Sequence, residues 1–314
     1  MGAKPEMPAL NREQGQGNAR GPSAPDQLLI IRNILIATDF SECSARALSY
    51  AMGIATRYEA RLHLFHCLDP TPYHLVAPDA VQSACDAAWR DMQRLDSDLR
   101  RGLAKNVKVK LLLEAGDLAA ILPQIVNEFD LNLIVVGTHG RTGWRKLVLG
   151  SVTEIVVDQA SCPVLTVGPC ADRTRLQQFG PENILLVSDA SARSKLAKAY
   201  AFSLARKYGS RLTVLHLLEG QSGSVLARAS EVEWRGPESR ELVTLEEELA
   251  DPSQLSPQIG SPSDVILQVA DESATDLIVL TVPAGHKFAH RLLSTNAYQV
   301  LRGARCPVLA VHAQ

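Results

Sequence analysis

Glycine and hydroxyl side chains recur at fixed spacing in one segment of the chain. Gly137, Gly140, Gly150 and Ser151 form the pattern G-x2-G-x9-G-S, and Arg141 lies within it. Glycine lets a backbone N–H approach an anion without a β-carbon in the way, a serine hydroxyl adds a donor, and an arginine offsets negative charge. The segment therefore predicts a site for phosphate groups. Two alternatives need no ligand: the glycines form only a tight turn, and Ser151 starts a helix through a Ser-x-x-Glu capping box.

The elements around this segment place it at the end of a sheet. Strands alternate with helices along the first half of the chain, which predicts a parallel sheet with helices on both faces. The expected order is strand 33–38, helix 42–57, strand 61–67, helix 79–104, strand 107–113, helix 117–128, strand 132–137, helix 151–160 and strand 163–167. Ligands of such sheets bind beyond the carboxyl ends of the strands, which is where the glycine segment lies.

The chain contains two copies of this pattern. Residues 33–68 and 183–218 are identical at 15 of 36 aligned positions. We predict an α/β fold of two tandem five-stranded parallel-sheet sandwich domains of Rossmann-like type, the second degenerate. The predicted divisions are a disordered tail at 1–28, a first domain at 29–168, a linker at 169–181 and a second domain at 182–314.

The last strands of the two copies, 163–167 and 307–311, are expected to pair edge to edge. Each is a short apolar strand, and pairing removes an apolar edge that would otherwise be exposed.

The second copy lacks the motif glycines. Aligned at an offset of 144, it has Thr281, Ala284 and Ser294 at the three glycine positions. A β-carbon there crowds the approach of the backbone to a phosphate. The sequence also indicates erosion between 219 and 260, because two prolines at 251–258 argue against a central third strand. We expect one phosphate site per chain, in the first copy.

Composition and charge exclude several other classes of protein. The formal net charge is −2, so no strong field attracts nucleic acid or an acidic membrane surface. No run of about 18 or more apolar residues predicts a membrane span. The six cysteines form no Cys-x-x-Cys pair or metal-ligand cluster, and no export signal precedes them. We therefore expect reduced thiols, no metal site and a cytoplasmic protein.

The glycine pattern resembles the ATP-binding motif of the universal stress protein family. A first strand that ends in Asp39 and a Pro-Val-Leu-x-Val last strand are similar to that family, and the resemblance covers 30–168 and 181–312. It implies ATP, with or without Mg²⁺, as the ligand of the first copy; ADP and AMP are alternatives. The implied cofactor-binding residues are Thr38, Asp39, Cys67, Gly137, His139, Gly140, Arg141, Gly150, Ser151, Val152 and Thr153.

The resemblance also implies a role for each part of this set. Asp39 would accept hydrogen bonds from the ribose, Cys67 would offer backbone groups to the adenine edge, and the glycines with Ser151 would hold the phosphates. For Asp39, capping the next helix or a turn is the alternative. No catalytic residue is predicted, because no partner carboxylate for His139 can be placed from the sequence.

A stress-response sensor or adaptor that depends on ATP binding is the function that the resemblance implies. Two alternatives stay open, a slow ATPase and an interaction scaffold that does not use nucleotide. The expected partners are an adenine nucleotide and a protein that the sequence does not identify. A homodimer of the chain also stays open.

Overall fold

The computed structural model describes residues 30–73, 79–101, 107–140, 149–171, 180–188, 194–219, 225–232, 255–282 and 296–313. The predicted tail at 1–28 and most of the predicted linker lie outside these residues.

The first copy has the element order that the sequence predicts. Its elements are β1 (Asn33–Ala37), α1 (Glu42–Tyr58), β2 (Arg61–Leu68), α2 (Ala80–Arg101), β3 (Val109–Ala115), α3 (Leu118–Glu128), β4 (Leu133–Gly137), α4 (Ser151–Gln159) and β5 (Val164–Val167). All the strand pairs within this copy are parallel. Strands β1, β2, β4 and β5 are largely buried and rich in branched residues because helices cover both of their faces. The edge strand β3 has only half-buried and exposed residues.

The second copy departs from the predicted parallel sheet. Its described elements are β6 (Asn183–Ser188), α5 (Lys195–Tyr208), β7 (Arg211–Glu219), β8 (Val225–Glu231), β9 (Ser256–Gln258), α7 (Pro262–Glu272), β10 (Leu277–Val282), α8 (Asn296–Gly303) and β11 (Val308–His312). β8 pairs antiparallel with β7, and β9 pairs antiparallel with β8. The prediction of five parallel strands is therefore wrong for this copy, and its sheet is mixed.

The strand β8 replaces the missing third strand and was not predicted. Its residues Val225 and Ala227 are buried, whereas Ala229 and Glu231 at its other end are exposed. The prolines of 251–258 do exclude a central strand, as expected, because β9 is a three-residue edge strand with every side chain exposed.

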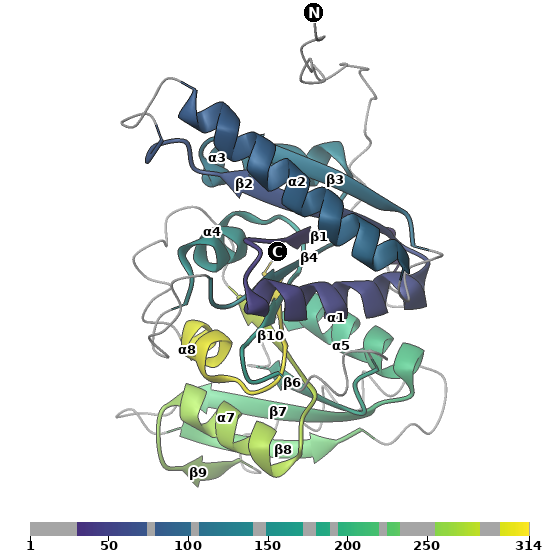
Figure 1. Ribbon diagram of the computed structural model, residues 1–314. Coiled ribbons are helices and arrows are strands. Elements are labelled where there is room, and N and C mark those ends of the chain that lie inside the picture. The colour runs from purple at the N-terminus through teal and green to yellow at the C-terminus, as the bar shows by residue number, and fades with distance from the viewer. Residues whose placement is uncertain are drawn as a thin grey trace, which may run out of the picture.

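The two copies share one continuous sheet. Eleven strands in the described part of the chain follow the order β3-β2-β1-β4-β5-β11-β10-β6-β7-β8-β9, with the first copy at the top of the view and the second below (Figure 1). β5 and β11 pair antiparallel, with Leu165 opposite Leu309. The predicted pairing of the two last strands is thus confirmed.

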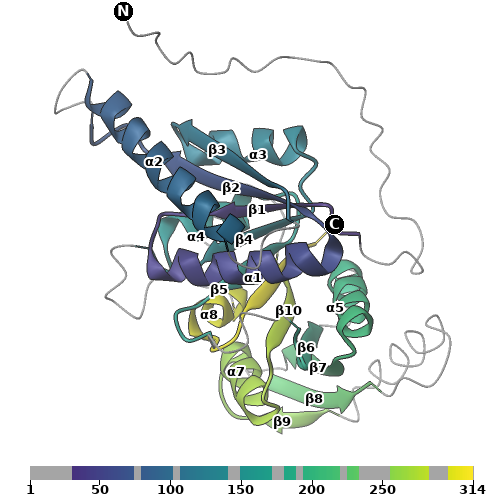
Figure 2. The same ribbon diagram turned by 45° about the vertical axis from the view of Figure 1, so that its right-hand side comes forward.

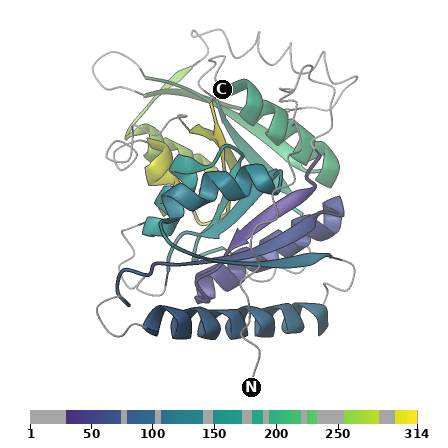
Figure 3. The same cartoon turned by 90° about the horizontal axis from the view of Figure 1, so that it is seen from above.

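Helices cover the sheet on both faces and divide the core into two layers. One buried cluster joins the sheet to α1, α2 and α5, and the other joins it to α3, α4, α7 and α8. Seen from above, α2 (dark blue) lies along the outer side of the first copy, over β2 and β3 (Figure 3). Met92 anchors it and is fully buried.

Equivalent residues of the two copies meet across an approximate two-fold axis. The rings of Tyr58 and Tyr208, at the ends of α1 and α5, lie 6.4 Å apart. Arg57 donates to the backbone oxygen of Lys207 (2.7 Å), and the Lys207 ammonium lies 5.2 Å from the Tyr58 ring. Figures 1 and 2 both show α5 beside the end of α1. Antiparallel pairing of β5 with β11 produces this arrangement, because it turns one copy by half a circle relative to the other.

Candidate functional site

The carboxyl ends of β1 and β4 form the edge at which the predicted residues gather. The chain runs from β1 outward to β2 and β3, and then returns to the other side of β1 as β4. The helix α1 packs on one face and α4 on the other. A crevice that suits a ligand opens at such a reversal of strand order. Asp39 follows β1 and Gly140 follows β4, so the structure brings both predicted segments to the carboxyl ends of these two strands.

Thr38 fixes the turn that follows β1. Its N–H donates to the oxygen of Phe65 (2.9 Å), and its Oγ1 donates to Ser44 Oγ (3.2 Å) and accepts from the N–H of Phe40 (3.1 Å). His66 Nδ1 lies 2.7 Å from the Thr38 oxygen, and its ring packs on Phe40 with centroids 4.8 Å apart. Thr38 is buried, and these bonds fix the backbone from which the Asp39 side chain projects.

Asp39 is half-buried, and one of its oxygens serves its own turn. Oδ1 accepts from the N–H of Ser41 (3.0 Å). The N-cap of α1 is Ser41, whose side chain accepts from the N–H of Ser44. Asp39 therefore does not cap the helix, although it does support a turn. Its Oδ2 faces Gly140: a β-carbon at Gly140 would lie only 2.9 Å from this oxygen.

The three glycines differ in why a side chain is excluded. At Gly137 a β-carbon would lie 2.9 Å from the carbonyl carbon of Cys43, so the packing of α1 on β4 requires this glycine with or without a ligand. At Gly140 the obstacle is the Asp39 carboxylate. At Gly150 the nearest atom, the oxygen of Thr138, would be 3.4 Å away, which is ordinary contact.

The first turn of α4 is anchored to the segment after β4. Gly150 is the N-cap and its N–H donates to the Thr138 oxygen (2.8 Å). Thr153 Oγ1 donates to the Gly137 oxygen (2.7 Å). Ser151 and Val152 are exposed. The N-terminus of α4, where free N–H groups and the helix dipole favour an anion, thus faces the surface beside Gly140.

The structure contradicts the alternative in which Ser151 starts α4 through a capping box. Ser151 is the first helical residue, and no side chain caps α4. The Glu154 carboxylate instead accepts a hydrogen bond from the hydroxyl of Tyr298 in the second copy (2.6 Å). The contact between the copies therefore takes the carboxylate that a capping box would have used.

The backbone of Cys67 faces the β1 side of its strand. In β2 the N–H of Leu62 donates to the segment just before β3, and the oxygen of Phe65 accepts from the segment just after β1. Backbone groups of a parallel strand alternate between neighbours, so odd-numbered Cys67 faces the β1 side, beyond the end of that strand. Burial, followed by the charges of Glu114 and Asp117, raises the pKa of its thiol to about 11, which keeps it protonated.

His139 lies between the glycines with its ring partly buried. Its Nδ1 lies 2.9 Å from Thr138 Oγ1, and its buried Nε2 has no hydrogen-bond partner among the described residues. Burial lowers the pKa of His139, so the ring is neutral at neutral pH. Within the described part of the chain, no hydrogen bond joins this ring to a carboxylate that would orient it as a catalytic base.

Some predicted residues lie outside the described part of the chain. Arg141 belongs to the stretch 141–148, and Ala284 and Ser294 of the second copy belong to 283–295. Thr281, the residue equivalent to Gly137 in the second copy, is described and half-buried; its Oγ1 has no partner within the described residues.

The family follows from comparison with known proteins. Residues 31–168 and 181–312 each match the model of the universal stress protein family. The chain belongs to this family. A universal stress protein of Methanocaldococcus jannaschii is 30% identical over 147 residues, which cover 44% of this chain and 82% of that protein. A putative universal stress protein of Staphylococcus haemolyticus is 30% identical over 148 residues, 45% of this chain and 86% of that protein.

Solved structures of the family resemble the whole tandem chain. A universal stress protein from Archaeoglobus fulgidus superposes with a TM-score of 0.68 at 19% identity and covers 91% of this chain and 98% of its own. A putative universal stress protein from Pseudomonas aeruginosa gives 0.56 at 17% identity and covers 91% and 95%. These likenesses support the fold of the tandem arrangement.

The described residues show neither a membrane-spanning helix nor a metal centre. No helix within them has the length and hydropathy that crossing a bilayer requires. They also contain no group of three or more acidic, histidine or cysteine residues placed to hold a metal ion.

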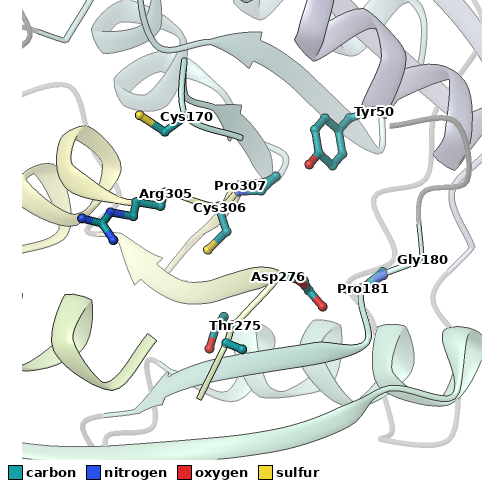
Figure 4. A pocket seen from close by; sticks show the side chains of 10 residues that line it. Tyr50, Cys170, Gly180, Pro181, Thr275, Asp276, Arg305, Cys306 and Pro307 are labelled. Atoms are coloured by element: carbon teal, nitrogen blue, oxygen red, sulfur yellow. The ribbon is translucent and has the colours of Figure 1, made fainter. Parts of the chain in front are cut away.

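A separate cavity of about 230 Å³ lies at the seam between the copies. Figure 4 shows Tyr50 and Cys170 of the first copy on one side, and Thr275, Asp276 and Cys306 of the second copy opposite. The second-copy residues precede β10 and β11, so they lie at the amino ends of those strands. Asp276 is structural, because its Oδ2 accepts from the N–H groups at 182 and 183 and so joins the starts of β6 and β10.

Sequence reasoning missed two residues at the edge of the candidate site, Tyr298 and Cys43. Cys43 excludes a side chain at Gly137, and Tyr298 binds Glu154. A signal for Tyr298 was present: it occupies the position equivalent to Glu154 at the offset of 144. Equivalent residues near a two-fold axis face each other, so the repeat and the strand pairing together predict this contact.

Proposed function

We propose that the first copy binds one adenine nucleotide, with ATP as the first candidate, in the crevice between the ends of β1 and β4. The observation that supports this most is the approach of Gly140 to the Asp39 carboxylate beside the open N-terminus of α4. A carboxylate and a set of free backbone N–H groups are thereby placed side by side. The carboxylate suits the hydroxyls of a ribose, and the N–H groups suit phosphate oxygens.

Each end of the nucleotide has a matching part of the crevice. The backbone N–H and C=O of Cys67, which face the β1 side, would hydrogen-bond the adenine edge, and Asp39 would bind the ribose. Gly140, Gly150 and Ser151 would contact the phosphates, assisted by Arg141. A magnesium ion, where present, would be held mainly by the phosphates, because the described residues offer only one carboxylate here.

The chemistry at this site favours binding over hydrolysis. No described residue is placed as an activated nucleophile or as an oriented base, and His139 lacks a carboxylate partner. We therefore infer a nucleotide-dependent sensor or adaptor, in which occupancy of the crevice alters a surface that a partner protein recognises. All six cysteines are free thiols, which suits the reducing cytoplasm.

Released nucleotide tests this proposal directly. The native chain and a Gly140→Val variant are purified without added nucleotide and denatured, and released nucleotides are identified and counted by mass spectrometry. We expect about one adenine nucleotide per native chain and none from the variant, whose side chain meets the Asp39 carboxylate.

Three other outcomes would contradict the proposal. Nearly two nucleotides per chain would show that the second copy also binds. No released nucleotide, together with no ATP binding in a titration of the native chain, would favour the nucleotide-independent scaffold. ATP turnover well above the rate without protein, and abolished by His139→Ala, would favour the slow ATPase.

A further inference from the structure

The second copy places a tyrosine at the start of α4 in the first copy. The Tyr298 hydroxyl donates to Glu154 Oε1 (2.6 Å) and accepts from the backbone N–H of Leu149. Tyr298 is 4% exposed and belongs to α8, on the sheet face that also carries α4 (Figure 2). Burial, followed by the bond to Glu154, raises the pKa of this hydroxyl to about 12, so it remains a donor.

The bonds of Tyr298 lie on either side of the turn whose backbone N–H groups are the candidates for binding phosphate. Leu149 immediately precedes Gly150, and Glu154 lies one turn into α4. The bonds of Gly150 and Thr153 fix the turn to the segment after β4, and the Tyr298 hydroxyl fixes it from the second copy. Both sides of the N-terminus of α4 are therefore held.

The sequence itself encodes the competing arrangement. Ser151 and Glu154 have the spacing of a capping box, in which the glutamate turns back to the backbone N–H of the serine. A phosphate at this helix start would use that same N–H, and the helix dipole attracts either anion. The bond to Tyr298 keeps the carboxylate out of this position.

We propose that Tyr298 is a positioning residue through which the second copy keeps the phosphate end of the first copy's site open. This role depends on the nucleotide site proposed above. By holding the Glu154 carboxylate, the hydroxyl leaves the N–H groups at the start of α4 to the phosphates of a nucleotide.

The difference between the copies explains why the contact works. Glu154 and Tyr298 are equivalent positions, so two identical copies would bring two carboxylates or two phenols together. Divergence supplies a donor opposite an acceptor. A copy that has lost the motif glycines therefore still takes part in binding at the other copy.

The test separates phosphate binding from nucleoside binding in the full chain. Native protein, Tyr298→Phe, Glu154→Ala and the double variant are titrated with ATP and with adenosine. We expect Tyr298→Phe to weaken ATP binding about tenfold, the usual effect of one hydrogen bond to a charged group, and to leave adenosine binding unchanged. Glu154→Ala should bind ATP nearly as the native chain does, and the double variant should recover most of the lost affinity.

Tyr58→Phe is the matched control. It removes a buried hydroxyl that has no hydrogen-bond partner in the described structure, from the other contact between the copies. We expect no change in ATP affinity.

Each other outcome contradicts the proposal in a distinct way. Equal ATP affinity in the native chain and Tyr298→Phe would overturn the role of Tyr298 but leave the site standing. Parallel losses for ATP and adenosine would indicate general destabilisation. If Tyr298→Phe does not fold, Glu154→Ala still decides, because a loss of ATP affinity there excludes a competing carboxylate. A native chain that binds neither ligand would overturn the nucleotide site and this role together.

Discussion

Gly140 and Asp39 approach each other so closely that a β-carbon on the glycine would lie 2.9 Å from Oδ2 of the carboxylate. The two residues come from different strand ends and are brought together by the β1–β4 pairing. The contact ties the glycine motif to the acidic residue that the sequence placed in the same site. It also defines what a side chain at position 140 would displace.

Gly140→Ala should reduce nucleotide affinity more than stability. The obstacle is the end of a side chain, which can rotate away, so we expect unfolding free energy to change by less than about 1 kcal/mol. Moving the carboxylate off the ribose position should weaken ATP binding about tenfold or more. Urea denaturation and ATP titration measure the two effects, and a large loss of stability without loss of affinity would refute this split.

Gly137→Ala should reduce stability more than nucleotide affinity. Its β-carbon would meet the backbone of Cys43 at 2.9 Å, and backbone cannot move aside as a side chain can. We expect a loss of about 1–3 kcal/mol in unfolding free energy, typical of overpacking. The same denaturation experiment tests it, with Gly140→Ala as the comparison; unchanged stability would show that α1 shifts freely.

Asp39→Asn should weaken nucleotide binding by weakening the hydrogen bonds from the ribose hydroxyls. Asparagine can still accept from the Ser41 N–H, so the turn should persist, but the charge that strengthens bonds from ribose hydroxyls is lost. We expect about tenfold weaker ATP binding, and little difference between native and variant for 2′,3′-dideoxy-ATP. Equal losses of affinity for ATP and 2′,3′-dideoxy-ATP would show that Asp39 does not bind the ribose hydroxyls.

His63 should make folding sensitive to acid. Its ring is 1% exposed and packs on Phe129 with centroids 4.9 Å apart, and neither ring nitrogen has a partner among the described residues. Burial, followed by the charge of Lys110, lowers its pKa from 6.5 to about 4. Between these values the unfolded chain binds more protons, so stability falls as the pH is lowered from 6.5 toward 4.

The size of this loss of stability follows from the lowering of the His63 pKa. It amounts to about 3 kcal/mol at most and is fully lost below the folded pKa. The measurement is urea denaturation of native protein and His63→Leu between pH 7 and pH 4. We expect the variant to lose less stability over this range; parallel curves for the two proteins would exclude His63 as the cause.

The local pattern of the sequence determined much of this protein. Helical spacing and short apolar runs predicted the nine elements of the first copy, because all its strands except the edge strand β3 are largely buried and its helices bury one face. The repeat predicted the two copies and, through the apolar last strands, the pairing of β5 with β11. The glycine spacing and Asp39 predicted which segments would share an edge.

Only the tertiary structure decided the remaining features, because they depend on contacts between residues distant in sequence. β8 fills the place of a lost strand by antiparallel pairing with β7, which no local pattern selected. Gly137 is required by Cys43 on another element, although its spacing predicted a phosphate contact. The Ser151–Glu154 capping box is locally favourable, yet the carboxylate bonds Tyr298 instead, since the two-fold arrangement brings a buried hydroxyl within 2.6 Å of it.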